Sequence, residues 1–356
     1  MNTESWIALS SVVGVLAAAL LGFWGWKRRL LASLRAGSRI AETSRGSVEY
    51  ALSGQGFVVL YFHGTVGGYD QGLAAASFIN GRDEEAQFTI LAPSRPGYLR
   101  TPLETGCTPE QQADAMAALL DHLGIDKVAV IGASGGGPFA LQFALRHPDH
   151  TSALVMFSAI TRRIAPRKRA RMRQWLLSSR GGLFLLDLFL STFLHLMLRR
   201  RIAWLARRLF RDMTARTATD ADIRHRVEAM LDHADQVRFF RMLVRCMLPL
   251  SARAAGILND ERQIAVLPEY PLERIVAPTL VLQGLEDCAA SPSHVKFVAD
   301  KIPGAEVYAI ERCGHFIWVG EHSQRMRAAL VEFLRKHAAP GGSAAGVCER
   351  PASAGC

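Results

Sequence analysis

The chain has 356 residues, of which 49% are hydrophobic and 21% charged. This size and composition exclude extensive disorder and leave room for one large domain with an insertion or for two smaller domains. The net charge of +10 is compatible with binding to nucleic acid or to an anionic membrane, so its distribution along the chain must decide between them. The six cysteines show neither close pairing nor zinc spacing, which predicts reduced thiols and no metal site.

Residues 6–26 form an uncharged, largely apolar segment. As a helix it would be roughly 30 Å long, the thickness of the hydrocarbon core of a bilayer. Tryptophans stand at both ends and the basic Lys27, Arg28 and Arg29 follow, so we expect residues 1–29 to be a single-pass anchor with the remaining chain cytoplasmic. A signal peptide cleaved near Ala17–Ala19 would instead give a secreted or periplasmic protein. A buried core helix is the third possibility.

Short strands and helices alternate after a predicted basic linker at residues 30–46. Segment 57–62 is apolar on both faces, which is typical of the middle of a parallel sheet. The alternation predicts an α/β fold with right-handed βαβ units, a mostly parallel sheet and helices on both faces. The predicted strands are 47–53, 57–62, 88–93, 127–131, 152–157, 279–283 and 306–310, and the predicted helices are 73–79, 109–123, 139–147, 293–302 and 324–337.

The alternation is interrupted by residues 161–274, which contain no clear strand and combine arginine clusters with a leucine-rich run at 183–198. We therefore expect a core of residues 47–160 and 275–338 with a helical insertion of residues 161–274. The leucine-rich run is too short and too polar to be predicted as a second span. Residues 339–356, rich in Ala, Gly and Ser, are predicted to be a disordered tail. Because the basic charge falls in the linker and the insertion without a nucleic-acid motif, no nucleic-acid partner is expected.

A Gly-x-Ser-x-Gly sequence centred on Ser134 stands between a predicted strand and a predicted helix. This context favours a sharp turn that exposes the serine hydroxyl. A serine nucleophile needs a base, an acid that orients the base, and donors for the oxyanion. Asp287 and His315 each follow a later strand and would lie at the same edge of the sheet. Glu286 is the alternative acid.

Together these motifs resemble the α/β-hydrolase fold family, specifically its serine hydrolases of the esterase and lipase kind. The resemblance implies that Ser134 is the nucleophile, His315 the general base and Asp287 the orienting acid, with the backbone N–H groups of Thr65 and Gly135 as the oxyanion hole. The matching segments, in chain order, are His63-Gly64 with Gly67-Gly68, Arg95-Pro96-Gly97-Tyr98, residues 132–136, Gly284 with Asp287, and Gly314-His315.

The resemblance also gives roles to residues around this set. His63 is expected to brace the oxyanion loop, and His63 and Gly64 are candidates for substrate contact. Cys288 and Cys313, which flank the acid and the base, are expected to be packed thiols rather than nucleophiles.

In this family a helical insertion at residues 161–274 would be a cap over the active site. Its many leucines and phenylalanines indicate an apolar substrate, and its arginine clusters suit anionic lipid headgroups. Phe184 and His195 are candidates for contact with substrate. Asp187, Ser191 and His195 share one helix face, which could be a hydrogen-bonded packing face, the lining of a substrate tunnel or, least consistently with the geometry, a second triad. The cap could pack on the sheet alone, but we favour a cap that also touches the membrane.

The sequence therefore predicts a membrane-anchored serine hydrolase that cleaves an ester with an apolar acyl chain and needs no metal or organic cofactor. Its expected partners are a small-molecule or lipid acyl ester and the membrane, the latter through the N-terminal helix and the cap. An acyltransferase, a perhydrolase or a carbon-carbon hydrolase would use the same residues. A non-catalytic hydrolase-fold binding protein is the alternative from a different class, and the complete Ser, Asp and His set argues against it.

Overall fold

The computed structural model describes residues 3–81, 88–165 and 170–337, and over these residues the chain forms one eight-stranded sheet. The strand order is β1-β2-β4-β3-β5-β6-β7-β8. β2 is antiparallel to both of its neighbours, and the other pairs are parallel, which confirms the predicted mostly parallel sheet. The strands are β1 (Arg39–Thr43), β2 (Gly46–Ser53), β3 (Phe57–Phe62), β4 (Phe88–Pro93), β5 (Val128–Ala133), β6 (Thr151–Phe157), β7 (Thr279–Gly284) and β8 (Glu306–Ile310).

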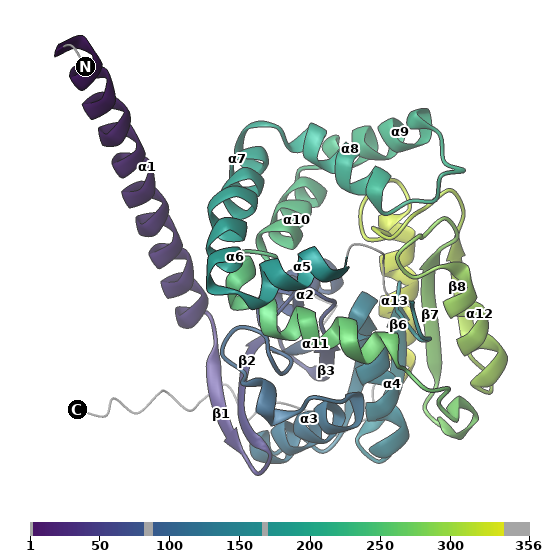
Figure 1. The fold of residues 1–356 in the computed structure, drawn as a ribbon. Helices are drawn as coiled ribbons and strands as arrows, with labels where there is room; N and C mark the ends of the chain where they lie inside the picture. The colour runs from purple at the N-terminus through teal and green to yellow at the C-terminus, as the bar shows by residue number, and fades with distance from the viewer. Residues whose placement is uncertain (1–2, 82–87, 166–169, 338–356) are drawn as a thin grey trace.

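Helices cover both faces of this sheet (Figure 1). One face packs against α3 (Pro109–Leu123), α4 (Gly137–Arg146) and α12 (Pro292–Lys301), and the other against α2 (Tyr69–Ile79) and α13 (Ser323–His337). Because side chains alternate along a strand, β3 supplies apolar residues to both cores. Its residues 58, 60 and 62 enter the first core, and residues 59 and 61 enter the second. The β3 run is therefore apolar throughout because both of its faces are covered.

The N-terminal segment differs from the predicted anchor and linker. α1 runs from Thr3 to Ala36 without a break, and β1 pairs with β2 directly after it, so residues 30–46 are not a linker. The reason is that residues 30–36 are good helix formers with no Gly or Pro until Gly37. Within the described residues two helices are long and apolar enough to cross a membrane, residues 10–36 and residues 180–200.

The segment between β6 and β7 is helical, as the absence of strand patterns predicts. It contains its own apolar core, built around Leu205, Phe210, Val227 and Phe240. A π-helical turn at Leu186–Ser191 joins α6 and α7 into one apolar run, which is longer than the sequence-predicted run of 183–198. The helices are α5 (Ala170–Ser178), α6 (Arg180–Leu185), α7 (Thr192–Arg200), α8 (Ile202–Asp212), α9 (Asp220–Leu231), α10 (Ala234–Arg245) and α11 (Ala254–Ala265), with short 3₁₀ turns at 250–252 and 272–274.

The predicted tail at residues 339–356 lies outside the described residues. So do Arg167, Lys168 and Arg169 of the basic run at the start of the insertion.

Candidate active site

Ser134 stands on a sharp turn between β5 and α4, with a positive φ of 49°. A non-glycine residue in this left-handed region is strained and is held there by its surroundings. Two neighbouring glycines make the turn possible. A Cβ at Gly132 would lie 2.6 Å from the Cβ of Ala140, and one at Gly136 would lie 2.3 Å from the carbonyl oxygen of Phe62. The turn therefore requires the glycines of the Gly-x-Ser-x-Gly motif.

The structure brings Ser134, His315 and Asp287 into one hydrogen-bonded chain. His315 Nε2 lies 3.0 Å from Ser134 Oγ, and His315 Nδ1 lies 2.7 Å from Asp287 Oδ2. With a proton on Nδ1 directed at the carboxylate, Nε2 is left as an acceptor for the serine proton. This arrangement provides a nucleophile, a base and an orienting acid.

Asp287 is buried and fixed from several sides. Its Oδ1 accepts hydrogen bonds from the N–H groups of Ala289 at 2.7 Å and Ala290 at 2.9 Å. Its Oδ2 accepts from Gln283 Nε2 at 2.9 Å as well as from His315. These donors compensate the loss of water around the carboxylate and hold it in one orientation. Glu286 makes no contact of this kind with His315 among the described residues.

The backbone of Thr65 and that of Gly135 lie side by side next to Ser134. A Cβ built on Gly135 would lie 3.0 Å from Thr65 N, and one built on Gly64 would lie 3.0 Å from Ser134 Cβ. The Thr65 N–H has no hydrogen-bond partner among the described residues. Two backbone donors beside the nucleophile are the arrangement that stabilises an oxyanion.

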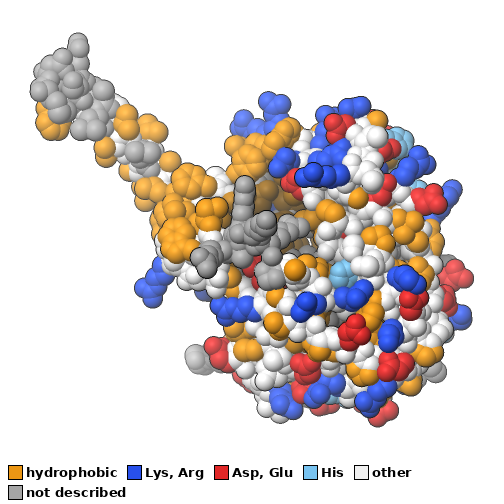
Figure 2. Space-filling model, turned by 45° about the vertical axis from the view of Figure 1, so that its right-hand side comes forward, with side chains coloured by type: hydrophobic (Ala, Val, Ile, Leu, Met, Phe, Trp, Pro, Cys, Tyr) orange, Lys and Arg blue, Asp and Glu red, His pale blue; other side chains and the backbone are white. Residues whose placement is uncertain are grey.

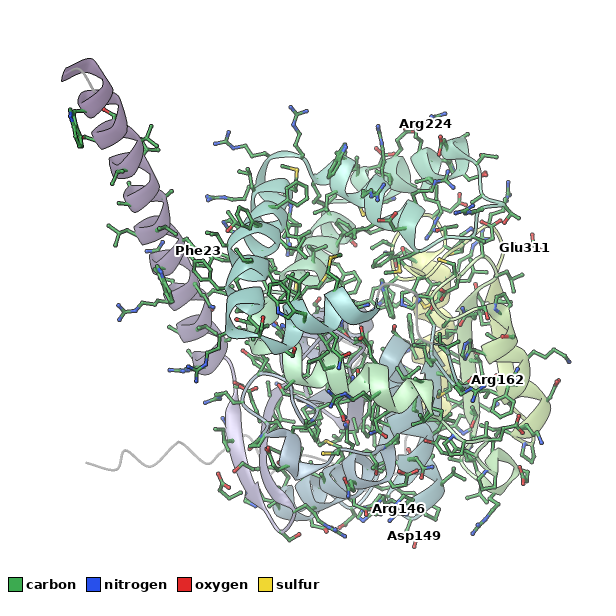
Figure 3. All side chains as sticks on the ribbon, viewed as in Figure 1. Phe23, Arg146, Asp149, Arg162, Arg224 and Glu311 are labelled. Carbon is green, nitrogen blue, oxygen red and sulfur yellow. The ribbon has the colours of Figure 1, made fainter. Side chains whose placement is uncertain are left out.

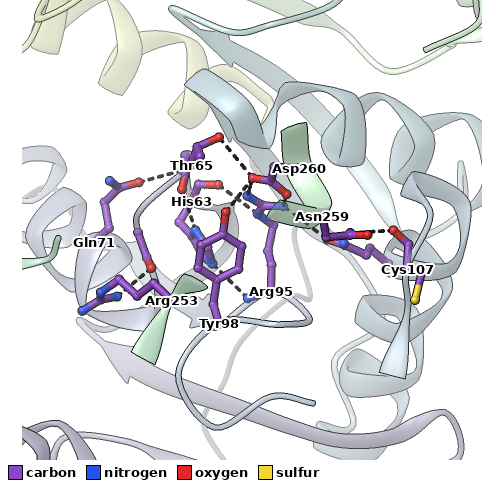
Figure 4. A network of polar contacts seen from close by, with 12 residues as sticks. His63, Thr65, Gln71, Arg95, Tyr98, Cys107, Arg253, Asn259 and Asp260 are labelled. Atoms are coloured by element: carbon purple, nitrogen blue, oxygen red, sulfur yellow. Dashed lines mark hydrogen bonds and ion pairs between the residues drawn. The ribbon is translucent and has the colours of Figure 1, made fainter. Parts of the chain in front are cut away.

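Residues 64–68 form the loop that carries Thr65, which we call the oxyanion loop, and His63 is fully buried beneath it (Figure 4). Its Nδ1 bonds to the carbonyl oxygen of Gly64 at 2.8 Å, and its Nε2 accepts from Arg95 N at 2.9 Å. Burial, together with the nearby Arg95 and Arg253 guanidinium groups, holds the pKa of His63 well below its ordinary value, although the bond to Gly64 opposes this. His63 is therefore neutral and braces the loop from behind.

A buried carboxylate from the insertion reaches the same loop. Asp260 of α11 forms a two-pronged ion pair with Arg95 at 2.9 and 2.6 Å. It also accepts hydrogen bonds from Tyr98 Oη at 2.7 Å and Thr65 Oγ1 at 3.1 Å (Figure 4). Asp260 and Arg95 are both almost completely buried, so neither charge has water as an alternative partner. The insertion is thus tied directly to Thr65, whose backbone lies beside that of Gly135 next to Ser134.

Arg253 makes a second tie between the insertion and the oxyanion loop. Its guanidinium donates to the carbonyl oxygen of Gly67 at 2.6 Å and pairs with Asp70, at the start of α2, at 2.7 Å. A third contact lies above the acid and the base. His315 N donates to the carbonyl oxygen of Met213, and Ala215 N donates to that of Glu286. The insertion therefore contacts the oxyanion loop, the loop that carries Asp287 and the loop that carries His315.

Phe184 and His195, expected to contact substrate, are placed against α1 instead. The ring of Phe184 lies 6.0 Å from that of Phe23, and the ring of His195 lies 5.4 Å from that of Trp26. The helix period shows which residues share a face but does not show what covers that face. Here the N-terminal helix covers it.

Asp187 and Ser191 are buried and hydrogen-bonded to each other at 3.1 Å. They therefore belong to a hydrogen-bonded packing face rather than to a second triad. Of the two cysteines beside the site, Cys313 is buried as expected. Cys288 is exposed, contrary to expectation, and its Sγ contacts the carbonyl oxygen of Asp212.

The residues that the sequence did not single out are Asp260, Arg253, Gln283 and Gln71, whose Oε1 accepts from Gly64 N at 2.7 Å. Asp260 carries a weak signal, because it is a charged residue on the apolar face formed by Ile257 and Ile264. Within the described residues no group of three or more His, Cys, Asp or Glu side chains is arranged to hold a metal ion.

A sequence model of the alpha/beta hydrolase fold matches residues 58–320. An alpha/beta hydrolase fold protein from Nakamurella multipartita is 32% identical and superposes with a TM-score of 0.74, covering 84% of this chain and 99% of its own. An uncharacterized hydrolase of Bacillus subtilis (strain 168) is 27% identical over 293 residues, 81% of this chain and 95% of its own.

Two further similarities concern named activities. A 2-hydroxymuconate semialdehyde hydrolase of Pseudomonas putida is 26% identical over 284 residues, 79% of this chain and 88% of its own. The structure of a membrane phospholipase A, described as a bacterial virulence factor, superposes with a TM-score of 0.57 at 19% identity, covering 94% of this chain and 99% of its own.

Proposed function

The chain belongs to the α/β-hydrolase fold family. We propose that it is a membrane-anchored serine hydrolase that cleaves a carboxylic ester with an apolar acyl chain. The observation that carries the proposal is the hydrogen-bonded chain Ser134–His315–Asp287 beside two backbone donors. It supplies each of the parts that ester hydrolysis by a serine requires.

In the proposed reaction, Ser134 Oγ attacks the ester carbonyl while His315 Nε2 takes its proton. The oxyanion is stabilised by the N–H groups of Thr65 and Gly135. His315 then returns the proton to the leaving alkoxide, and the acyl group remains on Ser134. A water molecule deprotonated by His315 attacks this acyl-enzyme and releases the acid. Asp287 stays ionised and stabilises the imidazolium in both halves of the reaction.

The apolar acyl chain is supported by the residues next to the oxyanion loop. Val66 of that loop packs in an apolar cluster with Leu177, Leu183 and Leu186 of the insertion. A polar acyl group would have to give up its water against these side chains without gaining hydrogen bonds from them. An alkyl chain would lose no hydrogen bonds there.

Membrane attachment is supported by α1 and by the length of one structural match. The apolar part of α1 is largely exposed, including Val13, Val15 and Leu21. The match to the membrane phospholipase A covers 94% of the chain, whereas the matches to the Nakamurella protein and to two esterases cover 83–85%. We propose that α1 spans the bilayer with the catalytic domain on the cytoplasmic side, where the basic residues after Trp26 would lie.

The cap also offers an apolar surface next to α1 (Figure 2). Its large exposed side chains are Leu185, Phe189, Leu190, Phe193, Leu196 and Trp204. Exposed arginines at 199–201, 207 and 208 follow closely in sequence. Apolar side chains bordered by basic ones suit the boundary between acyl chains and anionic headgroups, so we propose that this surface touches the bilayer.

The test is hydrolysis of p-nitrophenyl esters from acetate to palmitate by detergent-solubilised full-length protein, beside Ser134→Ala. Serine-dependent activity that rises with acyl length would support the proposal. Activity confined to the acetate ester would support a serine hydrolase but contradict the proposed apolar acyl chain. Carbonate extraction of membranes tests the anchor, since release of the full-length protein into the supernatant would contradict a span.

The second candidate is hydrolysis of a carbon-carbon bond, which the similarity to the 2-hydroxymuconate semialdehyde hydrolase favours. The same triad could serve it. Cleavage of a 2-hydroxy-6-oxo dienoate faster than any ester in the series would favour this candidate over ester hydrolysis.

A further inference from the structure

The C-terminal part of α1, from Phe23 onward, packs against the insertion, so α1 is more than a free tether. In Figure 3, Phe23 lies on the face of α1 turned toward α6 and α7. Phe23 is 7% exposed and its ring contacts that of Phe184, while Trp26 and Leu30 pack beside the core of the insertion. The end of the helix nearest the catalytic domain is therefore part of the domain's packing.

An ion pair fixes this contact. Lys27 Nζ lies 2.7 Å from Asp187 Oδ2, and the side chain of Asp187 has no exposed surface while that of Lys27 is 17% exposed. The other oxygen of Asp187 accepts from Ser191 Oγ and from the backbone N–H of Ser251, both at 3.1 Å. A carboxylate without access to water needs a compensating charge, and among the described residues Lys27 is the cation paired with it.

Asp187 connects the anchor to the oxyanion loop in a few steps. Ser251, which donates to Asp187, stands two residues before Arg253. The guanidinium of Arg253 is buried and holds the carbonyl oxygen of Gly67 at 2.6 Å. Gly67 N donates in turn to the carbonyl oxygen of Gly64, which closes the turn that carries Thr65.

We propose that Lys27 and Asp187 are positioning residues for the active site. The ion pair holds the segment 250–253 in place, and this segment sets the oxyanion loop through Arg253. The anchor helix α1 thus helps to position the active site in addition to attaching the protein to the membrane. This inference rests on the proposed function in one respect, the role of the Thr65 N–H as an oxyanion donor.

The inference makes a specific prediction for charge. Lys27→Met keeps an unbranched side chain, one atom shorter than that of lysine, but leaves the buried Asp187 without its paired cation, so the carboxylate must move toward water or take up a proton. Either change disturbs the bond to Ser251. Adding Asp187→Asn removes the unpaired charge and keeps an oxygen for the Ser251 N–H. The double variant Lys27→Met/Asp187→Asn should therefore work better than Lys27→Met alone.

The experiment measures kcat and KM on the best p-nitrophenyl ester, and the rate at which an alkyl fluorophosphonate labels Ser134. It uses the full-length protein in detergent, with kcat expressed per Ser134 titrated to completion so that misfolded protein is not counted. Complete removal of one oxyanion donor costs about 10²–10³ in kcat. For a displaced donor we expect Lys27→Met to lower kcat about tenfold with little change in KM, and the double variant to recover most of that loss.

Arg28→Met is the matched control, because it removes the same charge from an exposed neighbouring position of the same helix. It should leave kcat near the wild-type value. Equal kcat for Lys27→Met and Arg28→Met would overturn the inference, and so would a double variant no better than Lys27→Met. If the wild type cleaves no ester, the proposed function fails, but the labelling rates of the same four proteins still decide whether the ion pair positions the site.

Discussion

Two sets of polar side chains meet at the carboxyl edge of the sheet, and they are held there in different ways. Ser134, Asp287 and His315 each follow the end of a strand of the parallel sheet, so the sheet itself brings them together. The cap is joined to the core by buried ion pairs instead, such as Asp260 with Arg95. The sheet therefore positions Ser134, Asp287 and His315, whereas ion pairs between residues distant in sequence hold the insertion against the core.

The largest effect is expected at the acid of the triad. Asp287→Asn should lower kcat by about 10⁴, because the amide cannot stabilise the imidazolium and favours the wrong tautomer of His315. Glu286→Gln, its neighbour, should change kcat little. Steady-state kinetics on one ester decide between them. The reverse order of effects would assign the acid to Glu286 and contradict the role given to Asp287.

The next largest effect is expected in the cap, on stability. Asp260→Asn leaves the buried guanidinium of Arg95 without its counter-charge, which should lower the free energy of unfolding by about 3–5 kcal/mol. Glu261→Gln on the same helix removes a partly exposed partner of Arg173 and should cost about 0–1 kcal/mol. Denaturant unfolding compares the two. Equal costs would show that buried ion pairs do not hold the cap.

A third prediction concerns pH and the region behind the acid. Burial, with a smaller contribution from Arg162, lowers the pKa of His294 to about 4, and the nearby Asp287 opposes this. The unfolded chain binds a proton near the ordinary pKa of about 6.5 while the folded chain does not. The contribution of neutral His294 to the free energy of unfolding is therefore fully present above about pH 6.5. It falls by about 1.4 kcal/mol per pH unit as the pH is lowered toward about 4.

His294→Asn provides the comparison for this pH effect. The amide oxygen can still accept from Thr161 N, which the imidazole does at 2.9 Å, but the amide cannot take up a proton. The melting temperature of the wild type should therefore fall more steeply between pH 7 and pH 5 than that of the variant. Parallel curves for the two proteins would contradict the assignment.

The smallest effect is expected on the exposed surface of the cap. Phe189→Ser with Phe193→Ser should lower hydrolysis of a long-chain ester in anionic vesicles roughly threefold, because less apolar area enters the bilayer. Hydrolysis of a soluble short ester should not change. Val276→Ser, a still more exposed apolar position outside the insertion, serves as the control. A loss on both substrates would point to packing within the cap instead.

The sequence could predict the strand-end half of the site because its signals are local. A strand, a turn and a chemically suitable residue stand next to one another at Ser134, Asp287 and His315. The parallel sheet then requires that they share an edge. The same reasoning predicts the order of strands and helices in the core from Ser47 onward, because short apolar strands alternate along the chain with helical segments. It misses β1, which lies in the segment predicted as a linker.

The cap contacts could not be predicted in this way. Asp260 and Arg95 are separated by 165 residues, and nothing near either one specifies the other. The helix period places Asp187 on one face with Ser191 and His195, but it does not reveal that Lys27 pairs with Asp187 on that face. A charged residue whose partner is distant in the sequence has no local signal that identifies that partner.

The most direct test of Ser134 as the nucleophile is to treat the full-length protein with ethyl and dodecyl fluorophosphonates. Peptide mass spectrometry then locates the adduct and follows its formation over time. Ser134 should carry the adduct, the dodecyl reagent should react faster, and ester hydrolysis should cease as Ser134 is filled. An adduct on another residue, or ester hydrolysis that continues after Ser134 is fully modified, would contradict Ser134 as the nucleophile.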